Sequence, residues 1–168
     1  MSLSADFLAS QGAIVWDGRM ATILVPMDTS RSAERVLEGA AKLAGGVAGR
    51  LLLFHVVEPV ATYVPVGASM DVIATTPPMV GPDQSQAAIK RLEELAGPLR
   101  AGGLEVECDA IVGMAVDEIL ERARSRGVDY IVLGSHGHGA LFHLFSGSVV
   151  TGVLKHTPCP VVVVPVRD

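Results

Sequence analysis

The segment 131–156 holds the residues of this chain that are best suited to bind a ligand. It opens with an apolar run, continues through a glycine-rich loop and closes on what reads as the start of a helix. Its key residues are Gly134, Gly137, Gly139, Gly147 and Ser148. The first N–H groups of a helix have no internal partners, and the helix dipole gives them partial positive charge. Because glycines let the main chain approach an anion closely, this order predicts a phosphate-binding cradle made mostly of main chain.

Two common phosphate motifs are absent from this segment. No lysine precedes Ser148, as the P-loop pattern requires, and Gly139 is not followed by the third glycine of the dinucleotide pattern. On the loop alone, a flexible connection with turn glycines is therefore an alternative to a phosphate site.

Strand and helix patterns alternate along the chain around this segment. The expected strands are 22–26, 50–57, 104–112, 129–133 and 161–165, with a helix between each pair. This order predicts an α/β fold with an open five-stranded parallel sheet and helices on both faces. In such sheets ligands bind beyond the carboxyl ends of the strands, where the strand order reverses. The 168 residues fit a single domain, expected over 20–168, preceded by an N-terminal extension over 1–19.

Composition narrows the class of protein. Hydrophobic residues make up 49% of the chain, charged residues 18%, and the mean hydropathy is +0.44. Strands of a parallel sheet buried on both faces explain these values, and no apolar run reaches the roughly 18–20 residues of a membrane span. The net charge of −5 and the lack of a basic stripe argue against nucleic acid as a partner. The two cysteines, Cys108 and Cys159, share no metal-type spacing, and with no signal peptide they indicate a cytoplasmic protein.

Several residues near strand ends allow two readings. Asp28 follows the strand 22–26 and could cap the next helix or bind a ligand. His55 lies in an apolar strand, where a packed and hydrogen-bonded side chain is expected rather than a ligand. In the strand 104–112, the polar residues alternate with apolar ones, which predicts a sheet edge with one face toward water. The spacing of Glu118 and Arg122 predicts an ion pair along a helix.

The glycine loop matches a longer fingerprint. Gly134-x2-Gly137-x9-Gly147-Ser148 resembles the G-x2-G-x9-G-[S/T] signature that marks the nucleotide-binding branch of the universal stress protein family. The resemblance implies an adenine nucleotide alpha hydrolase-like, Rossmann-like sheet with strand order 3-2-1-4-5. The reversal would then lie between the strands 22–26 and 129–133, which Asp28 and Gly134 follow.

The same resemblance implies a ligand, ATP or AMP, and a role for each site residue. Asp28 would accept hydrogen bonds from the ribose hydroxyls, and Val149 would add a main-chain donor. His138 stands where the family often carries Lys or Arg, so amides, Mg²⁺ or protonated histidine would meet the phosphate charge. The phosphates would be held by Gly134, Gly137, Gly147 and Ser148. The base would be contacted by Pro26, Val56 and Leu133.

By resemblance, the function would be that of a nucleotide-linked stress-response regulator with little or no turnover, at most weak ATP hydrolysis. It would act as a homodimer formed through the C-terminal strand 161–166. Two alternatives remain open. His136, His138 and His143 could hold a metal ion for nucleotide phosphohydrolysis, since imidazole suits Zn, Ni and Cu. The chain could also be a structural partner that dimerises without binding a nucleotide.

Overall fold

The elements of the fold alternate between strand and helix, as the sequence predicts. The computed structural model describes residues 19–28, 33–59, 82–135 and 148–166. The strands are β1 (Ala21–Pro26), β2 (Gly49–Val57), β3 (Val106–Val112), β4 (Tyr130–Gly134) and β5 (Val161–Val164). The helices are α2 (Ala33–Val47), α3 (Pro82–Ala101), α4 (Ala115–Ser125) and α5 (Ser148–His156). Among these described helices, none has the length and apolar character needed to cross a membrane.

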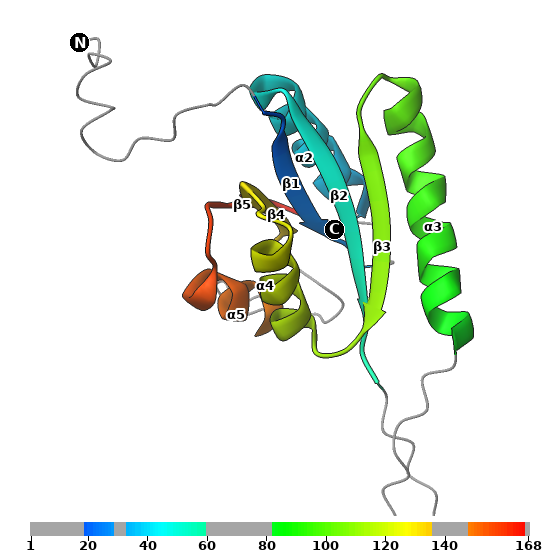
Figure 1. Ribbon diagram of the computed structural model, residues 1–168, viewed down its shortest axis with the longest axis vertical. Helices are drawn as coiled ribbons and strands as arrows, with labels where there is room; N and C mark the ends of the chain where they lie inside the picture. Colours follow the sequence, from blue (N-terminus) through cyan, green and yellow to red (C-terminus); the bar gives the residue numbers. More distant parts are fainter. Residues whose placement is uncertain (1–18, 29–32, 60–81, 136–147, 167–168) are drawn as a thin grey trace, which may run out of the picture.

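All five strands join one parallel sheet in the order β3-β2-β1-β4-β5 (Figure 1). This confirms the expected order 3-2-1-4-5 and puts its reversal between β1 and β4. Parallel strands bring all their carboxyl ends to one edge of the sheet, which lies at the lower end of Figure 1. Residues that follow β1 and β4 therefore meet at the point where ligands bind in folds of this type.

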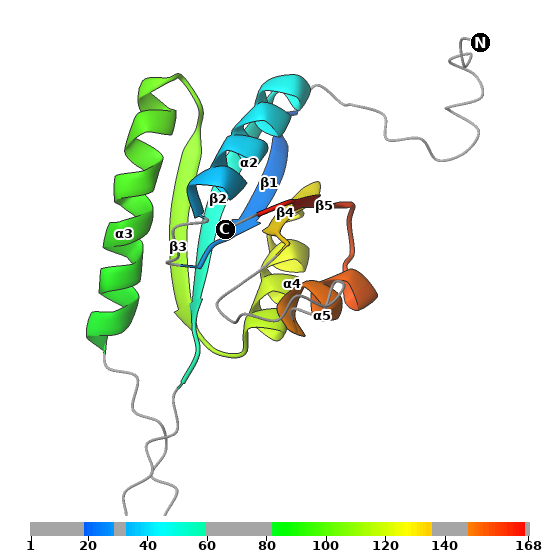
Figure 2. The ribbon, with the colours of Figure 1, turned by 180° about the vertical axis from the view of Figure 1, so that it is seen from behind.

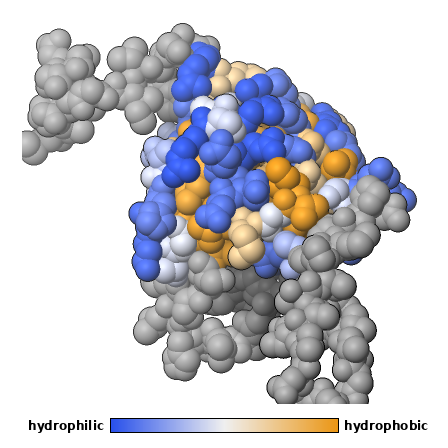
Figure 3. All heavy atoms as spheres, turned by 60° about the horizontal axis from the view of Figure 1, so that its bottom comes forward, coloured by the Kyte–Doolittle hydropathy of each residue, from blue (hydrophilic) through white to orange (hydrophobic). Residues whose placement is uncertain are grey.

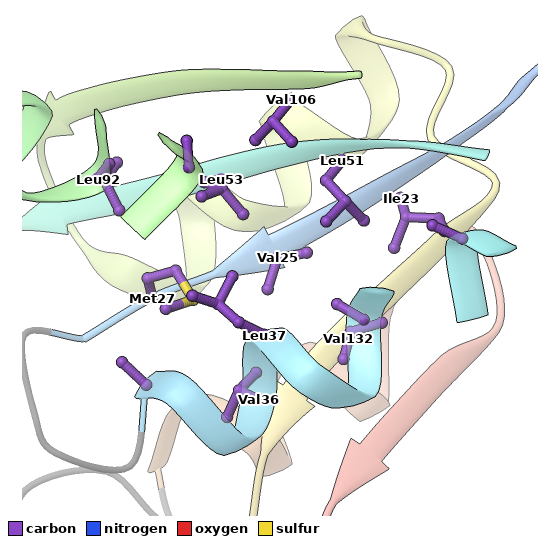
Figure 4. Packing of buried hydrophobic residues seen from close by; sticks show 14 of the residues in the cluster. Ile23, Val25, Met27, Val36, Leu37, Leu51, Leu53, Leu92, Val106 and Val132 are labelled. Atoms are coloured by element: carbon purple, nitrogen blue, oxygen red, sulfur yellow. The ribbon is translucent and has the colours of Figure 1, made fainter. Parts of the chain in front are cut away.

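Helices cover both faces of the sheet, and each face has its own core. One core lies under α2 and α3, and the other under α4 and α5 (Figures 1 and 2). Side chains alternate between the faces along each strand, so Ile23 and Val25 enter the first core while Leu24 enters the second. Figure 4 shows the first core, where side chains from β1 and β2 meet Val36 and Leu37 of α2. Burial on both faces explains the high apolar content of the strands.

The polar face of β3 carries ion pairs that the sequence did not predict. Glu107 accepts a hydrogen bond of 2.6 Å from Arg126, and Asp109 forms an ion pair with Arg122. The guanidinium of Arg122 also lies 4.9 Å from the ring centre of Phe54. The prediction of a sheet edge with one face toward water is confirmed, because β3 ends the strand order and Glu105 and Glu107 are exposed, while Asp109 is half-buried beside Arg122. The predicted ion pair within α4 was wrong, because Arg122 pairs with Asp109 of β3 instead.

Side chains tie the strands together at the amino edge of the sheet. Asp129, just before β4, accepts a hydrogen bond of 2.8 Å from the N–H of Thr22 and two bonds from Arg19. The Asp129 N–H in turn donates to the Thr22 carbonyl at 2.8 Å. Arg50 of β2 donates to the Thr22 hydroxyl at 3.1 Å. Polar groups from three neighbouring strands are thus joined at this end of the sheet.

Candidate functional site

The candidate site begins where the hydrogen-bond ladder between β1 and β4 stops. Within the described strands, β1 pairs with β2 from Ala21 through Pro26, but its pairing with β4 ends at Leu24 opposite Ile131. Even-numbered residues of β1 face β4, as the bond from Asp129 to the Thr22 carbonyl shows. Pro26 is the next such residue, and it has no N–H to donate. The ladder therefore cannot continue through it, and we call the ends of the two strands beyond this point the β1–β4 junction.

On the β4 side, the main chain of Gly134 faces this junction. The main-chain groups of Ile131 and Ser135 face β5 instead. The N–H of Ile131 donates to the Pro160 carbonyl at 3.0 Å, and that of Ser135 donates to the Val164 carbonyl at 2.9 Å. Main-chain groups of consecutive residues point to opposite sides of a parallel strand. The peptide groups of Gly134 consequently point toward β1, at the position where the signature begins.

On the other side of β1, the same alternation directs the main chain of Val56. The Phe54 carbonyl accepts the Met27 N–H at 2.7 Å, so Phe54 and Val56 face β1. Val57 faces β3, because its carbonyl accepts the Gly113 N–H at 3.2 Å. Val56 lies two residues beyond the one opposite Pro26, so its main-chain groups point past the end of the β1 strand.

The described residues bring part of the predicted site together. Pro26 and Asp28 stand at the end of β1 and are half-buried, while Leu133 and Gly134 end β4. Val149 is half-buried in the first turn of α5 and packs against the second core. Ser148 begins α5. Outside the described residues lie Gly137, His138 and Gly147, together with His136 and His143.

A close helix contact fixes the position of α5. A methyl group built on Gly152 would lie 2.7 Å from Cγ2 of Val116 on α4, far inside normal contact distance. Glycine at this position therefore lets α5 approach α4. Since α5 begins at Ser148, its packing also determines where the predicted phosphate-binding helix end lies.

Two contacts near the carboxyl edge involve partners that the sequence analysis did not predict. His55 was expected to be packed and hydrogen-bonded, and its Nδ1 does lie 2.7 Å from the Met27 carbonyl oxygen. Glu58, just after β2, accepts a bond of 3.4 Å from the N–H of Ala115 at the start of α4. Met114 offers no side-chain cap there, so the carboxylate takes that role. A polar residue at a strand end was the available signal, but its partner is distant in sequence.

Apolar side chains remain exposed beside the carboxyl end of β3. Val112 is 39% exposed and Met114 is 61% exposed. Figure 3 turns the lower end of Figure 1 forward and shows apolar surface among hydrophilic residues on this side. Because β3 is separated from β1 by β2, these two residues do not belong to the β1–β4 junction. Among the described residues, no group of three or more His, Cys, Asp or Glu side chains is arranged to hold a metal ion.

An open parallel sheet with helices on both faces, and with main-chain groups directed at its point of reversal, defines a doubly wound α/β protein. Comparison with known proteins names the family. The sequence model of the universal stress protein family matches residues 20–165. The protein named universal stress protein in QAH/OAS sulfhydrylase 3′ region, from Thermus aquaticus, is 32% identical over 149 residues, which are 85% of this chain and 97% of that protein. The chain belongs to the universal stress protein family.

Solved structures share the fold. The universal stress protein from Archaeoglobus fulgidus in complex with dAMP has a TM-score of 0.60 and 22% identity, covering 87% of this chain and 98% of that one. A universal stress protein in complex with cAMP has a TM-score of 0.59 and 22% identity, covering 86% of this chain and 95% of that one. At this identity the likeness shows the fold.

Proposed function

We propose that this protein binds an adenine nucleotide at the β1–β4 junction. The observation that supports the proposal is the early end of the β1–β4 ladder at Leu24 and Ile131, on the strands that lead to Asp28 and Gly134. Main-chain groups of Gly134 and Val56 face the junction from its two sides, as their strand registers require. Such groups can bind a phosphate and the edge of a base without any charged side chain.

Ligands of related folds support the choice of nucleotide. Two structural neighbours are complexes with dAMP and with cAMP, which share an adenine base and one phosphate. We propose AMP or ATP as the ligand here, with Mg²⁺ accompanying the phosphates of ATP. In this proposal Asp28 binds the ribose and Val149 adds a main-chain donor. Phosphate contacts are assigned to Gly134, Gly137, His138, Gly147 and Ser148, and base contacts to Pro26, Val56 and Leu133.

The cellular role that fits this site is regulatory. We propose a cytoplasmic, nucleotide-linked stress-response regulator with at most weak ATP hydrolysis. The acting unit would be the single domain 20–168, with 1–19 as an extension. No nucleic acid or membrane partner is part of this proposal.

A homodimer formed through the C-terminal strand is also proposed. β5 ends the sheet order, and its residue Val162 is 37% exposed. An apolar edge strand tends to pair with a second chain, and the next section of chain, up to residue 166, would extend the contact. Sedimentation of the wild type and of Val162→Lys tests this: a dimer that the variant converts to a monomer is expected, and a monomeric wild type would contradict it.

Isothermal titration with AMP, and with ATP plus Mg²⁺, tests the proposed function. The site variant is Gly147→Glu, which adds bulk and negative charge to the signature. The matched control is Gly45→Glu, because Gly45 on α2 is exposed and has no atom within 4 Å of an added methyl group. We expect micromolar binding in the wild type and the control, with a loss of at least about tenfold in the site variant.

Two results would contradict this function. One is the absence of binding heat with protein that is shown to be free of co-purified nucleotide. The other is equal affinity in the two glutamate variants, which would separate binding from the signature. A phosphate-release assay on the same samples measures turnover, which we expect to be slow or absent.

A further inference from the structure

At the end of β1, the side chain of His55 stands in the place of a main-chain hydrogen-bond donor. The N–H of Met27 donates to the Phe54 carbonyl at 2.7 Å, which extends the ladder one residue beyond Pro26. If parallel pairing continued, the Met27 carbonyl would accept the N–H of Val56. Instead Nδ1 of His55 lies 2.7 Å from that carbonyl oxygen. Because a carbonyl oxygen only accepts, Nδ1 must carry the proton.

This bond fixes the peptide that leads into Asp28. The carbonyl of Met27 belongs to the Met27–Asp28 peptide, and the Met27 side chain is buried in the first core, where Figure 4 shows it at the end of β1. Both main-chain groups of Met27 are therefore held, one by Phe54 and one by His55. Asp28, the next residue, has its starting point and direction set by these two bonds.

We propose that His55 is a positioning residue for the nucleotide's ribose: its Nδ1–H holds the Met27–Asp28 peptide so that the Asp28 carboxylate meets the ribose hydroxyls. The inference rests on the proposed nucleotide site and adds a residue that acts through another. His55 itself touches no ligand in this arrangement. The same bond gives the Met27 carbonyl a donor other than Val56, whose N–H then remains directed toward the base.

The test compares two ligands and matched variants of the full chain. The ligands are AMP and 2′,3′-dideoxyadenosine monophosphate, which lacks both ribose hydroxyls. His55→Leu removes the donor, whereas His55→Asn places an amide N–H near the position of Nδ1. His55→Gln carries the same amide one bond further out and serves as the geometric control. Asp28→Ala removes the proposed ribose acceptor.

We expect the wild type to bind AMP at least about tenfold more tightly than the dideoxy nucleotide, the size of a lost hydrogen bond to a charged group. His55→Leu and His55→Gln should lose most of this preference while binding the dideoxy nucleotide within about twofold of the wild type. His55→Asn should restore the preference. Adding His55→Leu to Asp28→Ala should cause no further loss, because the two residues act on one contact.

Other outcomes would distinguish the role of His55 from the role of Asp28 and from nucleotide binding itself. Equal loss of both nucleotides in His55→Leu would make His55 a structural residue and overturn the inference. A wild type without preference would remove the ribose role of Asp28, and the inference with it, while leaving nucleotide binding intact. A wild type that binds neither ligand would overturn the proposed function. If His55→Leu does not fold, ¹⁵N spectra of the wild-type imidazole decide: a ring protonated at Nε2 alone would overturn the inference.

Discussion

The two edges of the sheet are built in opposite ways. At the amino edge, side chains complete the pairing between strands. Asp129 accepts hydrogen bonds from the Thr22 N–H and from Arg19, and Arg50 donates to the Thr22 hydroxyl. At the carboxyl edge, the β1–β4 ladder stops early because Pro26 has no N–H. In the described strands, the same two strands are therefore paired at one end and unpaired at the other.

Because of this difference, we expect changes at the amino ends of β1 and β4 to affect the stability of the fold, and changes at their carboxyl ends to affect ligand binding. Polar groups at the amino edge have partners within the protein, so their loss should weaken the fold and leave ligand affinity unchanged. Main-chain groups at the β1–β4 junction lie beyond the last pair of the ladder, Leu24 and Ile131, so changes there should affect the ligand first. Substitutions at the two ends of these strands can test this separation.

Asp129→Ala should give the largest loss of stability. It removes the acceptor of the Thr22 N–H, on a residue that is only 4% exposed, and the partner of Arg19. Leaving a buried donor without its partner costs about 1–3 kcal/mol, so we expect the free energy of unfolding in urea to fall by about 2–3 kcal/mol. AMP affinity should stay within about twofold. As a control, Arg19→Ala should cost at most about 1 kcal/mol, because an exposed ion pair contributes little.

Gly152→Ala should lower the free energy of unfolding by about 2 kcal/mol, because the added methyl group overpacks against Val116. The control is Gly45→Ala, where the added methyl group meets nothing within 4 Å and alanine should stabilise the helix by about 0.5–1 kcal/mol. Thermal unfolding of both variants measures the difference. Equal stability of the two would show that α4 and α5 do not pack closely at this point.

Pro26→Val should increase the stability of the fold and lower the affinity for AMP. Valine supplies the N–H that β1 lacks, so the ladder can extend toward β4 and gain about 1 kcal/mol. We expect AMP affinity to fall about tenfold as the β1–β4 junction closes. Amide hydrogen exchange should show protection at position 26. Pro165→Val, the same substitution after β5, should leave AMP affinity unchanged; rapid exchange at position 26 with unaltered binding would refute the role of the proline.

The thiol of Cys108 should react only slowly with an alkylating reagent in the folded protein. Burial, together with the neighbouring Glu93, raises the pKa of Cys108 from 9.0 to about 11. The thiolate fraction at pH 8 is then about a hundredfold lower than at the ordinary value, so alkylation by iodoacetamide should be correspondingly slow. The measurement uses Cys159→Ala to isolate one thiol, with urea-unfolded protein as the fast reference. Rapid alkylation of the folded protein would contradict this assignment.

Local patterns in the sequence were enough to predict the alternation of strands and helices. Apolar runs and glycine stops gave the five strands, and right-handed crossovers follow from their alternation with helices. The strand order came from the family resemblance of the signature at Gly134. The roles of Asp28 and of the signature residues remain predictions.

Contacts between distant segments escaped the sequence analysis. The pairing of Arg122 with Asp109, rather than with Glu118 in its own helix, depends on how α4 packs on the sheet. The bond between His55 and the Met27 carbonyl likewise depends on the register of β1 and β2. Neither spacing nor composition determines these registers.

The sequence by itself determined the type of each element, the apolar character of the strands and the proline that ends the β1–β4 ladder, because these depend on local periodicity and on the chemistry of single residues. Only the tertiary structure decided which groups face the β1–β4 junction and which polar side chains find partners. Those outcomes depend on strand register and helix packing, where a shift of one residue turns every main-chain group to the other side.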